Sequence, residues 1–169
     1  MNGVRRFNEA EAGRLRPELS ACCDVPAWVE AVLADRPYAS LDDLMAAADS
    51  AARRLTHEEV DRALAAHPRI GDRAEGSGAG AGWSRQEQAG VGPDEQTQRD
   101  LVAGNREYEQ RFGRVFLISA TGLAGEQILA SLRERLRNDQ AAEAAVVAEE
   151  LRKIALLRLR KLIEDGVQL

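Results

Sequence analysis

Three side chains in this sequence are of types that together could transfer protons on an anionic substrate. His67 ends a helical pattern directly before Pro68, and histidine is the commonest acid or base near neutral pH. Glu87 adds a carboxylate just after a glycine-rich stretch, 71–82. Arg158 falls inside the apolar stripe of the last helical segment, where a buried guanidinium needs an anion or must reach solvent. These groups suffice for acid–base chemistry without a cofactor.

Each of these residues also has a purely structural interpretation. A histidine before a helix-ending proline is a common surface feature. Ser84 and Glu87 have the spacing of a capping box, in which the glutamate only binds the serine backbone N–H. Arg158 can form an ion pair with a glutamate of another helix. Taken together, these interpretations describe a non-catalytic helical module for protein interactions.

Other site chemistries have little support. Two histidines and the adjacent pair Cys22–Cys23 provide no CxxC or HxxxH spacing, so no metal site is predicted. The glycine-rich stretch lacks the Gly-Lys-Ser/Thr ending of a P-loop. A net charge of −5, from 23 basic and 28 acidic residues, argues against a dedicated nucleic-acid-binding protein.

The composition predicts an all-α protein. Hydrophobic residues make up 44% of the chain but aromatic residues only 4%, and the strong helix formers Ala, Leu, Arg and Glu dominate. We expect one domain, residues 1–169, folded as a bundle of about seven to nine helices. The chain has no signal-peptide pattern and no run of 18 apolar residues, which predicts a soluble, cytoplasmic protein without membrane contact. The two cysteines are expected to be small buried packing residues.

Helix boundaries are marked by prolines, caps and glycines. Proline should interrupt the first helix at Pro17, begin one at Pro26 and end another at Pro68. Further helix starts are predicted at the caps Ser40, Thr56 with Glu59, Asp94 and Asp139, and helix ends at Gly113 and Gly166. The apolar run 115–120 is either extended or a buried turn of helix. The glycine-rich stretch 71–82 is expected to be a loop that is flexible or closes over a ligand.

Five segments in order resemble a known enzyme family. They are "AHPRIGD", "SRQEQAG", "NREYEQRFGRVFLISATG", "RERLRND" and "KIALLRL". Together they resemble the 2-oxo-4-hydroxy-4-carboxy-5-ureidoimidazoline (OHCU) decarboxylase family, which forms (S)-allantoin at the end of urate degradation. The similarity extends over nearly the whole chain.

The resemblance implies an all-α homodimer that acts on an anionic ureidoimidazoline without a metal or an organic cofactor. It implies His67 and Glu87 as the catalytic residues, either of which could deliver the final proton. The implied substrate-binding residues are Pro68, Ser84, Gln88, Arg158 and the backbone around Ile118. A closing loop at 71–82 would exclude water, which otherwise protonates the intermediate on either face.

Overall fold

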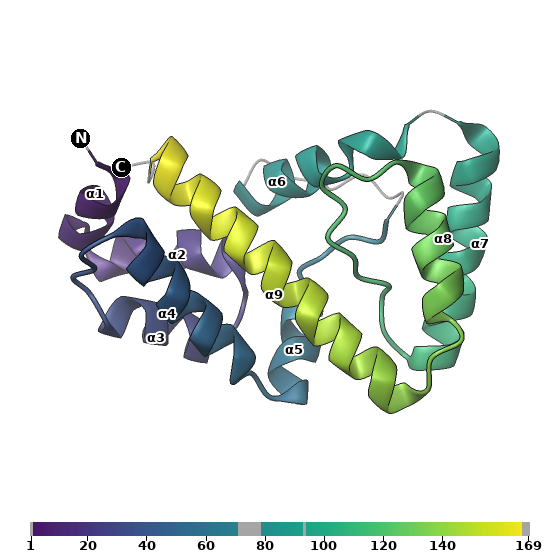
Figure 1. The fold of residues 1–169 in the computed structure, drawn as a ribbon, viewed down its shortest axis with the longest axis horizontal. Helices are drawn as coiled ribbons and strands as arrows, with labels where there is room; N and C mark the ends of the chain where they lie inside the picture. The colour runs from purple at the N-terminus through teal and green to yellow at the C-terminus, as the bar shows by residue number, and fades with distance from the viewer. Residues whose placement is uncertain (1, 71–78, 93, 167–169) are drawn as a thin grey trace. The chain divides into compact units, whose positions relative to one another are not determined.

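A computed structural model describes residues 2–70, 79–92 and 94–166. Over these residues the chain forms nine α-helices, one short 3-10 helix and no strand, which confirms the predicted all-α fold (Figure 1). The elements are α1 (Gly3–Glu9), α2 (Ala12–Cys22), α3 (Pro26–Ala34), α4 (Leu41–Arg53), α5 (His57–Leu64), α6 (Ala79–Glu87), η1 (Ala89–Val91), α7 (Glu95–Phe112), α8 (Gly125–Arg135) and α9 (Gln140–Asp165). The chain divides into two compact units, a first unit of Met1–Ala63 with Arg152–Leu169, and a second unit of Leu64–Leu151.

The first unit packs helices α1 to α4 with the C-terminal half of α9 (Figure 1). Trp28 is fully buried, and its indole N–H donates to the carbonyl oxygen of Ala48 at 3.1 Å, which joins α3 to α4. Asp49 of α4 pairs with Arg152 of α9 at 2.5 Å. The fully buried large side chains of this unit include Phe7, Leu15, Leu19, Trp28, Leu44 and Leu159.

The second unit contains α6, η1, α7, α8 and the first half of α9. Helices α7 and α8 pack closely because Gly104 has no side chain: a Cβ there would lie 2.2 Å from Cδ2 of Leu132. Around this contact lies an apolar core of Ile70, Leu101, Tyr108, Phe112, Phe116, Ile118, Ala120, Ile128, Leu129 and Leu132. This core supports the segments that carry most of the candidate site residues.

Several predicted helix boundaries are confirmed by local hydrogen bonds. The hydroxyl of Ser40 accepts from the Asp43 N–H at 3.1 Å at the start of α4. Thr56 and Glu59 form the complete capping box, with hydrogen bonds of 2.8 and 3.2 Å. Gly113 closes α7 in the left-handed conformation, with φ of 68°. Each of these contacts joins residues no more than four positions apart, so the sequence pattern already specifies it.

Asp94 caps α7 with a charged carboxylate. Its Oδ2 accepts from the Thr97 hydroxyl at 2.6 Å and from the Thr97 backbone N–H at 2.9 Å. These two hydrogen bonds hold the pKa of Asp94 below its ordinary value. The stabilisation is therefore complete above the unfolded pKa and is lost as the pH falls through the folded pKa.

We expect Asp94→Asn to remove this pH dependence while keeping a capping oxygen on α7. The free energy of unfolding of the two proteins should differ most near neutral pH. The difference should shrink as the pH falls below about 4, the ordinary range for an aspartate. Urea unfolding of both proteins across this range measures it, and a difference that is independent of pH would contradict the assignment.

Two predictions about prolines need correction. Pro17 lies inside α2 and does not interrupt it. Pro17 and Gly13, whose carbonyl loses its helical N–H partner, are both exposed, so water can satisfy that carbonyl. Pro68 does not end α5, which already stops at Leu64. The turn that follows is closed by the His67 backbone N–H, which donates to the Leu64 carbonyl oxygen at 3.0 Å.

The described part of the predicted loop 71–82 is helical. Residues 71–78 lie outside the described residues, whereas 79–82 form the first turn of α6. Glycine is a poor helix former, but helices in proteins are stabilised mainly by tertiary burial. Ser84 is buried one turn later, which is consistent with such an override of local propensity.

The run 115–120, whose conformation the sequence left open, is not helical. Phe116, Leu117 and Ile118 are nonetheless buried, so this segment passes through the core of the second unit as irregular chain. Buried irregular chain needs partners for its backbone N–H and C=O groups.

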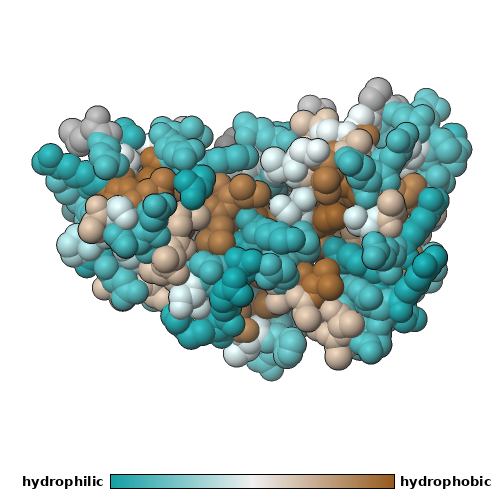
Figure 2. All heavy atoms as spheres, in the orientation of Figure 1, coloured by the Kyte–Doolittle hydropathy of each residue, from teal (hydrophilic) through white to brown (hydrophobic). Residues whose placement is uncertain are grey.

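The surface drawn in Figure 2 is mostly hydrophilic, with hydrophobic residues showing between the hydrophilic ones. Val102 and Leu157 are the exposed large hydrophobic residues of the described part, at 45% and 39%. No helix within the described ranges is both long and apolar enough to span a bilayer.

Candidate active site

His67 and Pro68 lie half-buried in the connection that follows α5. The next two residues attach this connection to α7. Arg69 forms two hydrogen bonds with the Glu109 carboxylate, at 2.6 and 3.2 Å, and the Ile70 carbonyl oxygen accepts from the buried amide of Asn105 at 2.8 Å. The imidazole is thus carried on a short segment that is anchored to a long helix.

Glu87 is the last residue of α6 and is half-buried. The alternative in which it completes a capping box with Ser84 is wrong, because α6 begins at Ala79 and places Ser84 in the helix interior. The Ser84 hydroxyl donates to the Gly80 carbonyl oxygen at 3.0 Å, one turn back. The C-terminal end of a helix is also an unfavourable position for a carboxylate. Helix capping therefore does not account for Glu87.

Gln88 follows Glu87 at the junction of α6 and η1 and is half-buried. Its backbone N–H donates to the Ser84 carbonyl oxygen at 3.2 Å. The next turn lies against the start of α8 at a distance that only glycine permits. A Cβ on Gly90 would lie 2.3 Å from the Leu123 carbonyl oxygen. This close approach fixes the end of α6 that carries Glu87 and Gln88.

Ile118 is 8% exposed and lies in the irregular segment 115–120. Charged side chains hold the backbone on both sides of it. The Leu117 carbonyl oxygen accepts from Nη1 of Arg135 at 2.6 Å, and the Ser119 N–H donates to Oε2 of Glu150 at 2.8 Å. The backbone around Ile118 is therefore held in one orientation.

Arg158 is 3% exposed, which confirms that its position on the helical stripe faces the protein interior. Its Nη1 donates to the Ala21 carbonyl oxygen at 3.0 Å, near the C-terminal end of α2. Carbonyl groups at a helix end carry partial negative charge, which suits a guanidinium. This contact lies within the first unit.

The adjacent cysteines are buried and form no disulfide, as predicted for packing residues. Burial, together with the Asp24 carboxylate and against the opposing Arg158 charge, raises the pKa of the Cys23 thiol to about 12. The thiol therefore stays protonated near neutral pH and is a poor nucleophile.

The structure places all the predicted site residues except Arg158 in the second unit. These residues are His67, Pro68, Ser84, Glu87, Gln88 and Ile118. Within the parts of the chain that are described, no three His, Cys, Asp or Glu side chains are grouped so that they could hold a metal ion. An imidazole, a carboxylate, an amide and oriented backbone groups can carry out proton transfer on a polar substrate.

Sequence reasoning missed the polar residues that hold these segments in place. The residues are Arg69, Asn105, Glu109, Arg135, Glu143 and Glu150. A signal was present for two of them, because Asn105 and Arg135 each occupy a position on the apolar stripe of their helix. Asn105 lies between Leu101 and Tyr108 at helical spacing, and both neighbours are buried.

Comparisons with known proteins agree with the family resemblance. The sequence model of the OHCU decarboxylase family matches residues 8–160. A 2-oxo-4-hydroxy-4-carboxy-5-ureidoimidazoline decarboxylase of Amia calva is 34% identical over 142 residues, which cover 82% of this chain and 81% of that protein. A uric acid degradation bifunctional protein of Bacillus sp. is 26% identical over 98% of this chain, which spans only 33% of that relative's length.

The fold also matches solved structures. A crystal structure of OHCU decarboxylase in the presence of (S)-allantoin superposes with a TM-score of 0.75 and 24% identity, covering 88% of this chain and 99% of that one. A structure of (S)-allantoin synthase superposes with a TM-score of 0.70 and 17% identity, covering 94% of this chain and 53% of that one. The family model spans nearly the whole chain, and the chain belongs to the OHCU decarboxylase family.

Proposed function

We propose that this chain decarboxylates OHCU to (S)-allantoin in urate degradation, as a carboxy-lyase that uses His67 and Glu87 for proton transfer. The observation that carries the proposal is the family match over residues 8–160, a range that contains every predicted site residue. The decarboxylase of Amia calva, with coverage above four fifths on both chains, supports the same reaction.

The reaction requires proton transfers and a place for negative charge. The reacting carbon of OHCU bears both the carboxylate and a hydroxyl group. When the bond to the carboxylate breaks, CO2 leaves and its electron pair is delocalised into the ring as an enol-like intermediate. His67 and Glu87 act on the hydroxyl and on this carbon, and one of them delivers the final proton to a single face. Positioned acid–base groups typically contribute about 10²–10⁴-fold each to the rate.

The other site residues hold the substrate. Gln88 and Arg158 bind ring or ureido oxygens and stabilise the developing oxyanion. Ser84, Pro68 and the Ile118 backbone line the pocket. Arg158, which belongs to the first unit, is included on the sequence resemblance alone. If Arg158 bound the departing carboxylate tightly, it would stabilise the ground state as much as the transition state and would not speed the chemical step.

The proposal also includes the assembly and location that the resemblance implies. The protein acts as a cytoplasmic homodimer, and the reaction uses no metal and no organic cofactor. In the alternative, a non-catalytic interaction module, Glu87 completes a capping box. Ser84 lies inside α6, so this structural role of Glu87 gives the module no support.

Circular dichroism of the product tests the proposed function. OHCU is unstable in water, so it is generated in place from urate by the two preceding enzymes, and this protein is then added. We expect an immediate rise of the (S)-allantoin signal, in proportion to the protein added. The reaction without this protein is the control and gives slow, racemic product. A rate and optical signal no different from that control would exclude the decarboxylase and leave the interaction module.

A further inference from the structure

A buried ionic cluster contacts the backbone of the segment that carries Ile118. It consists of Arg135 at the end of α8, Glu143 near the start of α9 and Tyr108 on α7. The side chains of Arg135 and Glu143 are 8% and 1% exposed. Oε1 of Glu143 accepts from Nε of Arg135 at 2.8 Å, from its Nη2 at 2.5 Å, and from the Tyr108 hydroxyl at 2.5 Å. The cluster fixes the direction in which the guanidinium points.

The remaining nitrogen of Arg135 holds the backbone of the irregular segment. Nη1 donates to the Leu117 carbonyl oxygen at 2.6 Å, and the guanidinium carbon lies 4.5 Å from the Phe116 ring centroid. Burial and the hydrogen bond to Glu143 raise the pKa of Tyr108, which keeps its hydroxyl a donor. A charge-assisted hydrogen bond to a buried carbonyl is about twice as strong as a neutral one.

Glu150, on α9, holds the other side of Ile118. Its Oε2 accepts from the Ser119 backbone N–H at 2.8 Å. A cation therefore binds the peptide group before Ile118, and an anion binds the peptide group after it. The two contacts join residues 18 and 31 positions apart in the sequence, so only the folded unit creates them.

Peptide geometry shows what these two contacts do to Ile118. Arg36–Pro37 is the one cis bond in the described ranges, so both peptide groups around Ile118 are trans. In a trans peptide the C=O and the N–H point in opposite directions. The Ile118 N–H thus points away from Arg135, and the Ile118 C=O points away from Glu150. No hydrogen bond between described residues uses either group.

The two charged side chains also polarise the Ile118 N–H and C=O, the groups that point away from them. A cation on the Leu117 carbonyl draws electron density from the shared peptide group and makes the Ile118 N–H a better donor. An anion on the Ser119 N–H makes the Ile118 C=O a better acceptor. Hydrogen bonds in a chain polarise one another in this way, and the effect is larger in a buried, low-dielectric environment.

We propose that Arg135 and Glu150 are positioning residues that orient and polarise the Ile118 peptide groups to bind the –CO–NH– edge of the substrate's ureido group. The Ile118 N–H donates to the substrate carbonyl oxygen, and the Ile118 C=O accepts from the neighbouring substrate N–H. This role rests on the proposed function, because it needs a ureido substrate at the Ile118 backbone.

The –CO–NH– edge does not react, so its contacts are the same in the ground state and the transition state. Loss of such a contact raises KM and leaves kcat nearly unchanged. A merely structural defect would instead lower the amount of active enzyme, and so the apparent kcat, at an unchanged KM. The split between the two constants separates a positioning role from a structural one.

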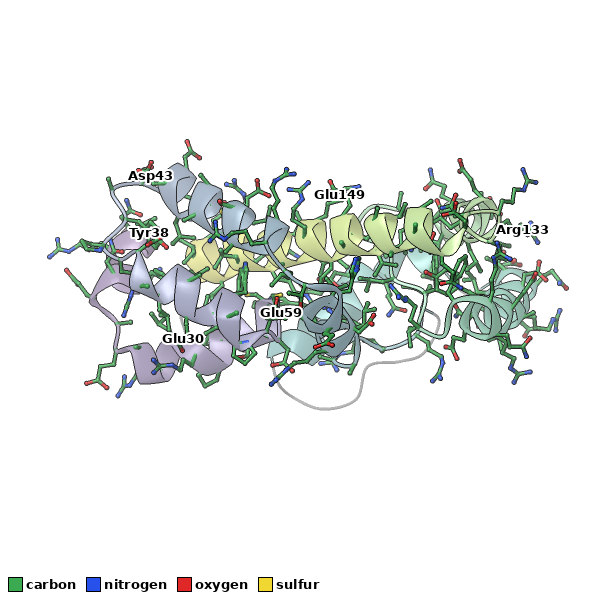
Figure 3. The ribbon with its side chains drawn as sticks, turned by 90° about the horizontal axis from the view of Figure 1, so that it is seen from below. Glu30, Tyr38, Asp43, Glu59, Arg133 and Glu149 are labelled. Carbon is green, nitrogen blue, oxygen red and sulfur yellow. The ribbon has the colours of Figure 1, made fainter. Side chains whose placement is uncertain are left out.

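The test compares three variants on α9. Glu150→Ala removes the acceptor of the Ser119 N–H, and Glu150→Gln keeps a neutral acceptor. Glu149→Ala, at the neighbouring position labelled in Figure 3, makes the same charge change. It leaves the hydrogen bond between the Ser119 N–H and Glu150 in place. Alanine is a strong helix former, so both alanine variants should fold. KM and kcat are measured with OHCU generated in place, beside a thermal unfolding curve for each variant.

We expect Glu150→Ala to raise KM about tenfold with kcat within about twofold of the wild type, as befits one lost oriented hydrogen bond. Glu150→Gln should recover most of the change, and Glu149→Ala should match the wild type. An active wild type with Glu150→Ala no different from Glu149→Ala would overturn the positioning role alone. A wild type without turnover would overturn the proposed function and the positioning role with it.

Discussion

Glu87→Gln and His67→Asn should each lower kcat by about 10²–10⁴-fold, the usual contribution of a positioned acid or base. Glutamine keeps the size of glutamate but cannot exchange a proton at neutral pH. Asparagine keeps a polar amide near the position of the imidazole but has no basic nitrogen. Initial rates of (S)-allantoin formation, followed by circular dichroism, measure both effects.

The same variants should hardly change the free energy of unfolding. Both residues are half-buried, and Glu87 does not complete a helix cap because Ser84 lies within α6. Both replacements keep a polar group of similar size, and such substitutions outside the core usually cost no more than about 1 kcal/mol. Loss of activity with unchanged unfolding curves would therefore show that the acid–base group was lost and not the folded protein.

Matched controls come from the same residue types elsewhere in the chain. His57→Asn changes the other histidine, which is exposed at the start of α5, and Glu95→Gln changes an exposed glutamate in the first turn of α7. Both controls should keep the activity of the wild type. If Glu87→Gln and His67→Asn are as active as these controls, neither residue takes part in the reaction.

Glu143→Ala should have the largest effect on stability, a loss of about 3–5 kcal/mol, because it leaves the buried Arg135 charge without its anion. The Tyr108 hydroxyl loses its acceptor in the same variant. For a chain of this length each kcal/mol corresponds to roughly 2–4 °C in the unfolding midpoint. Thermal unfolding followed by circular dichroism at 222 nm, a wavelength that reports helix content, measures the shift.

A surface ion pair provides the control for this prediction. Glu164→Ala removes the partner of Arg160 in a pair whose side chains are 44% and 56% exposed. Exposed pairs of this kind contribute about 0.5 kcal/mol or less. Equal shifts for Glu143→Ala and Glu164→Ala would mean that the buried cluster does not stabilise the second unit. Replacing Arg135 and Glu143 together by leucine should cost less than Glu143→Ala alone, since no unpaired charge remains.

Helix starts and stops were predictable because their causes are local. Ser40, the Thr56–Glu59 capping box and Gly113 act on backbone groups three or four positions away, and the structure confirms each of them. The sequence also placed Arg158 on an inward-facing stripe, which its 3% exposure confirms. Patterns at helical spacing report burial directly, since the stripe must face the interior.

Predictions failed where the surroundings in the folded chain, either packing or solvent exposure, overrode a local preference. Pro17 lies within α2, and the glycines at 80 and 82 lie within α6, although both residue types are poor helix formers. Water can reach the Gly13 carbonyl, which lowers the cost of the helical hydrogen bond that Pro17 cannot make. Burial of Ser84 in the middle of α6 accompanies the second exception. Neither burial nor exposure of this kind is visible in a short stretch of sequence.

The residue types of the candidate site were recognisable in the sequence, while their supports were not. His67, Glu87 and Gln88 stand out by type and by their place in family-like segments. The contacts that hold the surrounding backbone join Asn105 to Ile70 and Glu150 to Ser119, across 35 and 31 positions. The sequence by itself determined the helical class and most of the helix caps, because local contacts and periodicity encode them, whereas the candidate catalytic side chains were proposed from the family resemblance. Only the tertiary structure decided which buried charges orient the Ile118 backbone, because those contacts exist only after distant helices have packed together.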